Sequence, residues 1–192
     1  MASSPLPPWR LRDRTTVHDT RWLAVCRDQI VCSDGSDYVY DHVLLPASVT
    51  VLAVRDDGMV PVARQWIYTH RQRHWRLPSG GVDRADLDPE AAARRELKEE
   101  TGLTAAEWES LGTVNGADSA TNHRDHIFRA TGLTAGDADP GEGEGDLVVH
   151  WMPFAAVLDM VMNGRIGHAG STFAVLMAAM RRCDGMEPVM NN

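Results

Sequence analysis

Short apolar runs separated by turn residues fill the first part of the chain. Two strand-like runs cover residues 22–32, and a turn at 33–37 precedes a third run at 38–45. The turn contains an Asp-Gly pair between apolar segments, which indicates a β-hairpin. The pattern predicts a small antiparallel sheet that ends at Pro46.

A continuous, mostly β-branched run at residues 48–54 indicates a buried strand. After a turn at 56–58 we expect a second strand at 59–66, and a short strand at 75–77 leads into a loop at 78–81. Two adjacent glycines in this loop allow the backbone to approach a neighbour closely. Later strands are expected at residues 108–114, 126–130 and 147–152, with an exposed acidic loop at 137–146.

Three helices are expected between and after these strands. Asp88 suits an N-cap, Pro89 suits the first helical position, and Gly102 ends the helix that they begin. Residues 154–162 form an amphipathic pattern, and residues 172–182 are apolar on most faces, as expected for a helix packed on a sheet.

The strands do not alternate strictly with helices, which favours an α/β sandwich with a mixed sheet. We expect residues 47–192 to form this domain. Residues 1–46 form a separate annex in this interpretation, with a short flexible arm at 1–8 followed by the small antiparallel sheet.

The composition narrows the classes of partner. The chain has 192 residues and a formal net charge of -8, so it lacks a basic field for nucleic acid. An acidic protein can still bind nucleotides when a metal ion supplies positive charge locally. Three cysteines form no metal-ligand pattern and are expected to be reduced thiols. With neither a signal peptide nor an apolar run long enough for a membrane, a cytoplasmic location is expected.

Three glutamates in the helix after Asp88 carry the candidate chemistry. Glu96, Glu99 and Glu100 stand at i, i+3 and i+4, so they share one helix face. Like charges at this spacing repel each other, and hard divalent cations prefer such carboxylate oxygens. The alternative is a solvated acidic face, which is common on surface helices.

The context of these glutamates resembles the Nudix box. The run Arg95-Glu96-Leu97-Lys98-Glu99-Glu100-Thr101-Gly102-Leu103 matches the second half of the box at every defined position, and Gly81 has the box spacing from Arg95. One position departs: Leu87 stands where the box has its first glutamate, with Asp86 and Asp88 beside it. The chain thus resembles the Nudix hydrolases, with further likeness to their ADP-ribose pyrophosphatase and nucleoside diphosphate sugar hydrolase branch.

This resemblance implies a Nudix-type α/β/α sandwich and hydrolysis of the diphosphate linkage in a nucleoside diphosphate derivative, of the ADP-ribose or nucleotide-sugar type, by water attack on phosphorus. It implies Mg²⁺, or Mn²⁺, as the cofactor. The implied metal ligands are Glu96 and Glu100 with Glu99 assisting, and the carbonyl of Gly80 or Gly81.

The remaining catalytic roles also follow from the resemblance. Arg95 is expected to orient the glutamates by ion pairing. The general base is expected on the acidic loop, where Glu144 is favoured and Glu142 is second. The alternative is that both loop glutamates only keep an exposed segment soluble.

Substrate recognition is less constrained. The branch implies a homodimer formed through the N-terminal sheet, with Trp22, Arg27 or Arg64 near the ligand; each is equally compatible with core or surface. His123 stands where the branch tends to have an acidic residue. His123 and Arg124 either contact phosphate or form a satisfied loop pair, and a sugar nucleotide is as plausible a substrate as ADP-ribose.

Two other functions fit parts of the pattern. A Nudix-like sensor that binds a nucleotide without cutting it is supported only by the missing first box glutamate. A house-cleaning pyrophosphatase for oxidised nucleoside triphosphates fits the box, but it fits the N-terminal annex poorly.

Overall fold

The structure is a computed structural model that describes residues 8–138 and 145–183. It divides into two compact units, which are described separately. The first comprises residues 1–46 and 115–123, and the second comprises residues 47–114 and 124–192. None of the helices in the described part of the chain combines the length and apolar character needed to span a membrane.

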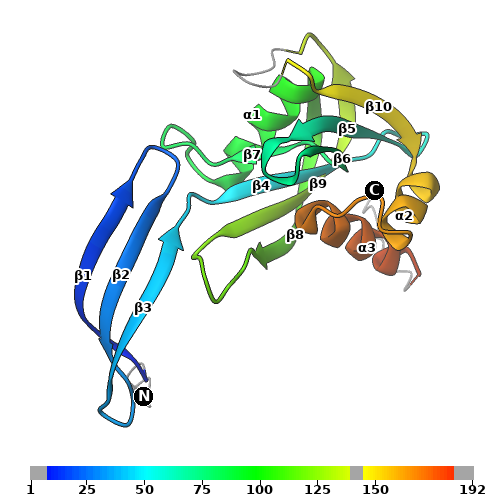
Figure 1. Cartoon of the computed structure of the whole chain (residues 1–192). Coiled ribbons are helices and arrows are strands. Elements are labelled where there is room, and N and C mark those ends of the chain that lie inside the picture. Colours follow the sequence, from blue (N-terminus) through cyan, green and yellow to red (C-terminus); the bar gives the residue numbers. More distant parts are fainter. Residues whose placement is uncertain (1–7, 139–144, 184–192) are drawn as a thin grey trace, which may run out of the picture. The chain divides into compact units, whose positions relative to one another are not determined.

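The first unit is built on an antiparallel sheet in the order β1-β2-β3. Its strands are β1 (Arg10–Asp19), β2 (Ala24–Val31) and β3 (Asp37–Leu44), drawn in blue in Figure 1. The segment 115–123 joins this unit through hydrogen bonds from the backbone N–H of Val43 to the Ala120 carbonyl and from that of Leu45 to the Asn122 side chain.

This unit corrects the sequence interpretation in two places. The two strand-like runs at 22–32 are one strand, β2. β1 was not predicted, because every one of its residues is exposed and its sequence shows no apolar alternation. Its conformation comes from backbone pairing with β2 along nearly its whole length, which leaves no burial pattern to detect.

The second unit contains two sheets, in the orders β7-β4-β9-β8 and β10-β5-β6. β4 pairs with β9 in parallel and with β7 antiparallel, so the expected mixed sheet is confirmed. The strands of this unit are β4 (Ser48–Ala53), β5 (Met59–Ile67), β6 (Gln72–Arg76), β7 (Ser79–Gly81), β8 (Leu103–Asn115), β9 (Arg124–Ala135) and β10 (Val148–Pro153).

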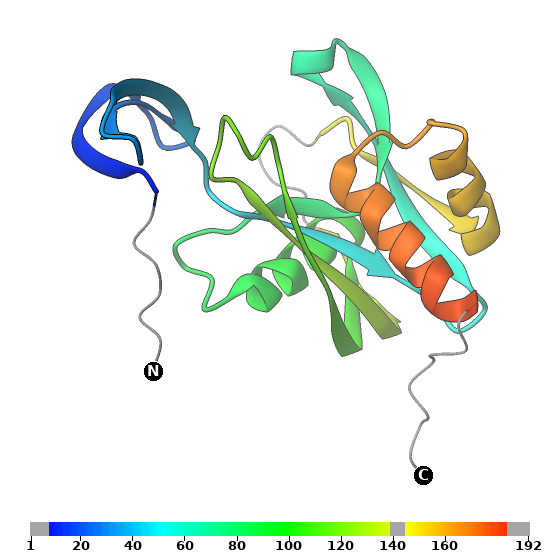
Figure 2. The ribbon, with the colours of Figure 1, turned by 90° about the horizontal axis from the view of Figure 1, so that it is seen from below.

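Helices cover both faces of the larger sheet, as expected for an α/β/α sandwich. Alternate residues of β4 face opposite ways. Val51 packs in one cluster with Leu97 of α1, whereas Leu52 packs in the other with Val157 of α2 and Val175 of α3. Figure 2 shows β4 in cyan passing between α1 in green and α3 in orange. The helices are α1 (Pro89–Thr101), α2 (Phe154–Met162) and α3 (Ala169–Cys183).

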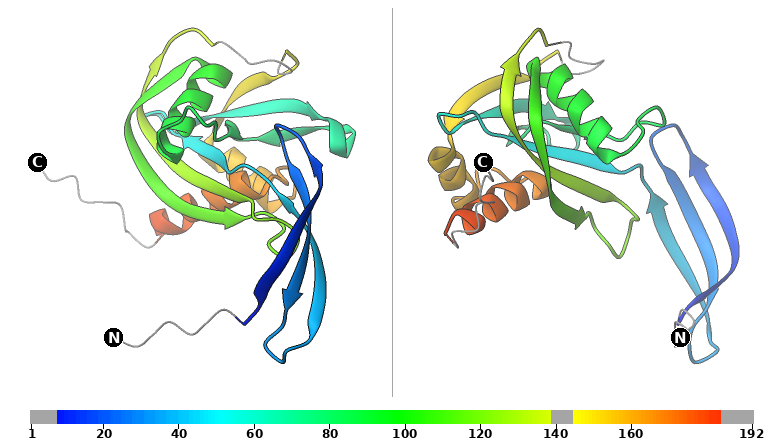
Figure 3. Two further views of the ribbon diagram at one scale, coloured as in Figure 1. Left: turned by 90° about the vertical axis from the view of Figure 1, so that its left-hand side faces the viewer. Right: turned by 180° about the vertical axis from the view of Figure 1, so that it is seen from behind.

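Several boundaries differ from expectation. The loop expected at 78–81 contains β7, whose residues pair with β4. The last helix begins at Ala169, before the predicted 172, and the strand expected at 75–77 spans Gln72–Arg76. Figure 3 shows the long strands β8 and β9, which extend beyond their predicted ends, with α1 in green beside them.

Candidate active site

The helix that carries the three glutamates is fixed by local sequence signals. The Asp88 side chain accepts a hydrogen bond from the Ala91 N–H, Pro89 occupies the first turn, and Gly102 ends the helix with φ of 72°. Ala93 and Leu97 are fully buried against the sheet. The predicted limits of this helix are therefore confirmed, and its glutamates are held rigidly by the apolar face.

Two of the glutamates are buried, which rules out a merely solvated acidic face. Glu96 is 6% exposed and Glu100 is 2% exposed, while Glu99 is half-buried. The backbone N–H of Ser79 donates to Glu100 Oε2 at 3.2 Å. Burying carboxylates is costly unless they are paired or bind a metal, so their position is functionally informative.

β7 approaches these carboxylates so closely that a side chain at Gly80 would displace the Glu96 carboxylate. A Cβ atom placed on Gly80 would lie 2.1 Å from Glu96 Cδ, whereas a Cβ on Gly81 would meet no atom within 4 Å. The β7–β4 pairing, in which Gly80 lies opposite Val49, fixes this approach. The backbone of β7 therefore forms one wall of the glutamate site.

Arg95 joins the glutamates to the preceding loop. Its Nη1 donates to Glu96 Oε1 at 2.8 Å and to Glu99 Oε2 at 2.9 Å, and its Nη2 donates to the Gly81 carbonyl at 2.8 Å and to Asp86 Oδ2 at 3.0 Å. The hydrogen bonds to Asp86, followed by those to Glu96, raise the pKa of Arg95, although burial opposes them. The guanidinium is therefore a permanent cation at this position.

At the Leu87 departure from the Nudix box, the neighbouring Asp86 contacts Arg95 instead. Leu87 is 95% exposed and points into solvent. The Asp86 side chain is only 8% exposed and lies against Arg95, whose hydrogen bonds lower the pKa of that carboxyl. Asp86 thus places a carboxylate on Arg95 from one residue earlier in the loop.

The residues present have the donor chemistry that a divalent cation prefers. Glu96, Glu99 and Glu100 offer hard oxygen donors, and Gly80 makes room for the Glu96 carboxylate beside its backbone. In the described residues no three acidic, histidine or cysteine side chains already converge in metal-binding geometry. Glu96 and Glu99 instead lie on Arg95.

The other predicted residues that the structure describes have neighbours of their own. Arg64 is exposed, with its guanidinium 5.1 Å from the centre of the Trp75 ring. In the first unit, Trp22 is 66% exposed under Arg21, Arg27 is paired with Asp41, and the His123 ring packs over Gly116. The remaining predicted residues are exposed Arg124 and the two loop glutamates, Glu142 and Glu144, which lie outside the described residues.

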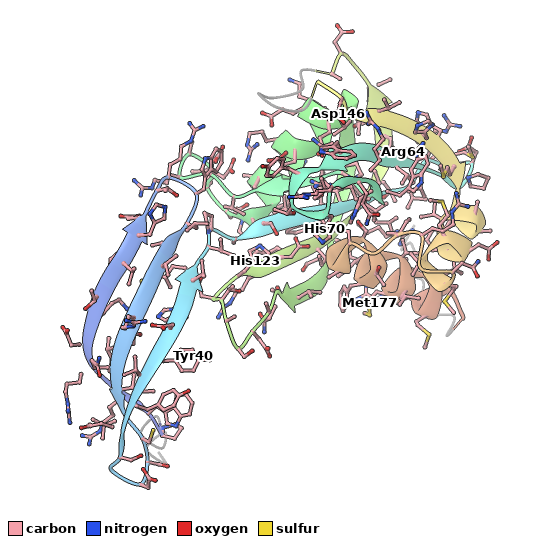
Figure 4. The ribbon with its side chains drawn as sticks, in the orientation of Figure 1. Tyr40, Arg64, His70, His123, Asp146 and Met177 are labelled. Carbon is pink, nitrogen blue, oxygen red and sulfur yellow. The ribbon has the colours of Figure 1, made fainter. Side chains whose placement is uncertain are left out.

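The loop that contains these two glutamates ends at an anchor. Asp146 Oδ2 accepts hydrogen bonds from the Trp66 backbone N–H at 3.0 Å and from Arg73 Nη1 at 2.9 Å. Figure 4 labels Asp146 ahead of β10. The anchor ties the start of β10 to the β5–β6 hairpin.

Sequence reasoning missed one arginine at the site. Arg76 Nη2 donates to the Ser79 carbonyl at 2.6 Å and lies 3.8 Å from Glu100 Oε1. Its place directly before the loop at residues 77–81 was the available signal, but the sequence does not show that β6 ends beside α1. The register of β6 on β5 decides it.

Comparisons with known proteins show the family of the chain. A family model described as NUDIX domain matches residues 44–172. The ADP-ribose pyrophosphatase of Mycobacterium tuberculosis (strain ATCC 25618 / H37Rv) is 31% identical over 162 residues, which cover 84% of this chain and 78% of that protein. The CMP-5'-(N-acetyl-N-hydroxy-3-aminopropyl)phosphonate hydrolase of Streptomyces rubellomurinus is 28% identical over 88% of this chain and 81% of its own length.

A solved structure of an ADP compounds hydrolase has the same fold. It superposes with a TM-score of 0.81 and 21% sequence identity, over 96% of this chain and 100% of that chain. The family model and the relatives define the class of protein as a hydrolase of pyrophosphate linkages. The chain belongs to the Nudix family and is a Nudix hydrolase, similar to the ADP-ribose pyrophosphatases.

Proposed function

We propose that this Nudix hydrolase cleaves the diphosphate linkage of a nucleoside diphosphate derivative, of the ADP-ribose or nucleotide-sugar type, with Mg²⁺ or Mn²⁺. The burial of Glu96 and Glu100 against the glycine wall of β7 carries the proposal. The similarity to an ADP-ribose pyrophosphatase over most of both chains supports the substrate class.

The chain's residues divide the work as follows. Glu96 and Glu100 would hold the metal with help from Glu99, and the Gly80 carbonyl would be the favoured backbone ligand because Arg95 already binds the Gly81 carbonyl. When bound there, a divalent cation would supply positive charge to the diphosphate and lower the pKa of a water. Arg95 positions Glu96 and Glu99, so catalysis relies mainly on orientation and electrostatics.

The water requires a general base, and we assign this role to Glu144, with Glu142 as the second choice. The assignment rests on the family resemblance; Asp146, two positions after Glu144 in the sequence, is hydrogen-bonded to β5 and β6. Arg64, Trp22, Arg27, His123 and Arg124 remain candidates for substrate binding. A homodimer formed through the first unit is part of the same proposal.

Replacing Glu100 tests the metal assignment. Glu100→Gln keeps the shape of the buried side chain and removes its charge, so we expect turnover to fall at least about 100-fold while the fold is retained. Turnover is measured with nucleotide sugars, dinucleotides and nucleoside triphosphates in Mg²⁺ and Mn²⁺, and products are resolved by mass. Circular dichroism melting checks the fold.

Glu90→Gln is the matched control, since Glu90 lies on the same helix but pairs with Arg94 at the surface. It should retain wild-type turnover. Unchanged turnover in Glu100→Gln would contradict the metal assignment. Tight nucleotide binding by the wild type, with no product over hours, would support the sensor alternative instead.

A further inference from the structure

A cavity of about 180 Å³ lies between the turn that joins β5 to β6 and the beginning of α3. Its polar lining consists of basic side chains, and no Asp or Glu is among the described residues that line it. The whole chain, by comparison, has 27 Asp and Glu, 19 Lys and Arg, and 8 His. Figure 4 labels His70 at the turn. The basic residues of the lining are His70, His74, Arg76 and His168.

The histidines on the turn are held in place by neighbours. The rings of His70 and His74 lie 4.8 Å apart between centroids. Thr69 Oγ1 lies 3.1 Å from His70 Nδ1, and the Gln72 side-chain nitrogen lies 2.9 Å from His74 Nε2. Each ring is thus oriented through one nitrogen, and the second nitrogen can serve a ligand.

Arg76 connects this cavity to the active site. It lines the cavity and also lies 3.8 Å from Glu100 Oε1. Its Nε is buried and makes no hydrogen bond within the described part of the chain. A buried guanidinium N–H without an acceptor is costly, so a small rotation of the side chain that gave Nε an oxygen acceptor in the cavity would be favourable.

The start of α3 adds positive potential to the cavity. Gly167 and Ala169 line the cavity where this 15-residue helix begins, and the N-terminus of a helix favours anions. His168 Nδ1 lies 2.9 Å from Ser171 Oγ, which accepts a hydrogen bond from the Leu77 N–H. The helix start is thereby tied to the segment that follows Arg76.

We propose that this cavity is a subsite for a phosphate group, either as free inorganic phosphate or as a phosphate monoester carried by the substrate beyond its diphosphate. Arginine and histidine N–H groups match the oxygens of such a dianion. The substrate form of the inference rests on the proposed function, whereas the binding of free phosphate does not.

Calorimetric titration of inorganic phosphate into the full chain, with EDTA present to exclude metal-site binding, tests the cavity directly. The double variant H70Q/H74Q should bind phosphate at least about tenfold more weakly than the wild type, as expected for the loss of hydrogen bonds to a charged group. The single variant H70Q, at an exposed position, should show a smaller loss. His18→Gln, on exposed β1, is the matched control and should bind as the wild type does.

Equal phosphate affinity in the wild type and H70Q/H74Q, or no binding by the wild type, would overturn the proposal. The substrate form is tested by KM values for ADP-ribose and for ADP-ribose phosphorylated on its terminal ribose. The double variant should raise only the second KM, by at least about tenfold. Weakened phosphate binding with unchanged KM values assigns the site to free phosphate. If the wild type hydrolyses neither compound, the proposed function fails. The phosphate titration still decides whether the cavity binds phosphate.

Discussion

The Arg95 site on α1 and the Asp28 site in the three-stranded sheet both join an arginine to buried carboxylate. At the second site, Arg14 Nε and Nη2 donate to the two Asp28 oxygens at 2.7 Å each, and His42 Nε2 lies 3.1 Å from Asp28 Oδ2. One carboxylate there meets one permanent cation. Arg95, in contrast, lies within 4 Å of four carboxylates, those of Asp83, Asp86, Glu96 and Glu99.

The Asp28 site and the Arg95 site differ in their balance of charge. A balanced pair, such as Arg14 with Asp28, satisfies a buried group and stabilises a sheet whose first strand is fully exposed. One guanidinium cannot neutralise four carboxylates, so the Arg95 site retains negative charge that suits a divalent cation. The two sites thus differ in net charge, although each is centred on one arginine.

The largest effect is expected from Gly80→Ala, which disrupts the geometry of the Arg95 site. Gly80→Ala would place a methyl group 2.1 Å from Glu96 Cδ, so the carboxylate must move by about 1 Å. We expect kcat to fall about 100-fold and metal affinity to fall with it. Steady-state kinetics and calorimetric Mg²⁺ titration measure the two effects.

Gly81→Ala provides the comparison on the same strand, because its methyl group meets no atom within 4 Å. Its loss of activity should be much smaller. Full activity in Gly80→Ala would show that the position of the Glu96 carboxylate is not critical.

The next effect concerns the stability of the Asp28 site. Asp28→Asn leaves Arg14 without its buried carboxylate, and the partial exposure of Arg14 reduces the cost. We expect the free energy of unfolding to fall by about 1–2 kcal/mol, measured by urea denaturation. Asp37→Asn, which disrupts an exposed pair with Arg12, should change it little.

The same variant has a pH signature. Hydrogen bonds from Arg14, helped by His42, hold the pKa of Asp28 below its usual range. The Asp28 carboxylate therefore stabilises the fold above its unfolded pKa of about 3.9, and this contribution is lost as the pH falls through the lower folded-state pKa. The stability difference between the wild type and Asp28→Asn should be full at pH 7 and shrink below pH ~4. A constant difference down to pH ~2 would contradict the assignment.

The smallest effect concerns Leu87, which stands where the Nudix box has its first glutamate. Asp86→Asn weakens the hydrogen bonds between the loop and Arg95. We therefore expect kcat to fall about tenfold, and Asp86→Glu should restore part of it. Leu87→Ala, at a position pointing into solvent, should behave as the wild type does. A larger loss of kcat in Leu87→Ala than in Asp86→Asn would show that position 87, where the box has its glutamate, is the important one.

Much of the fold could be predicted because the signals are local. The N-cap at Asp88 and the stop at Gly102 define α1 from neighbouring residues alone, and the β-branched run of β4 marks a buried strand. β1 could not be predicted, because a fully exposed strand carries no burial pattern. β7 is only three residues long, and its strand conformation depends on pairing with β4.

The sequence by itself determined the carboxylate face of α1, because residues at i, i+3 and i+4 share a side of any helix. It also determined the family, through the spacing of Arg95 to Leu103. Only the tertiary structure decided that Gly80 of β7 lies close to Glu96, and that Asp86 contacts Arg95 in place of Leu87. It also decided that the β5–β6 turn and the start of α3 line one cavity with basic side chains. These contacts depend on strand register and chain packing, which local spacing does not encode.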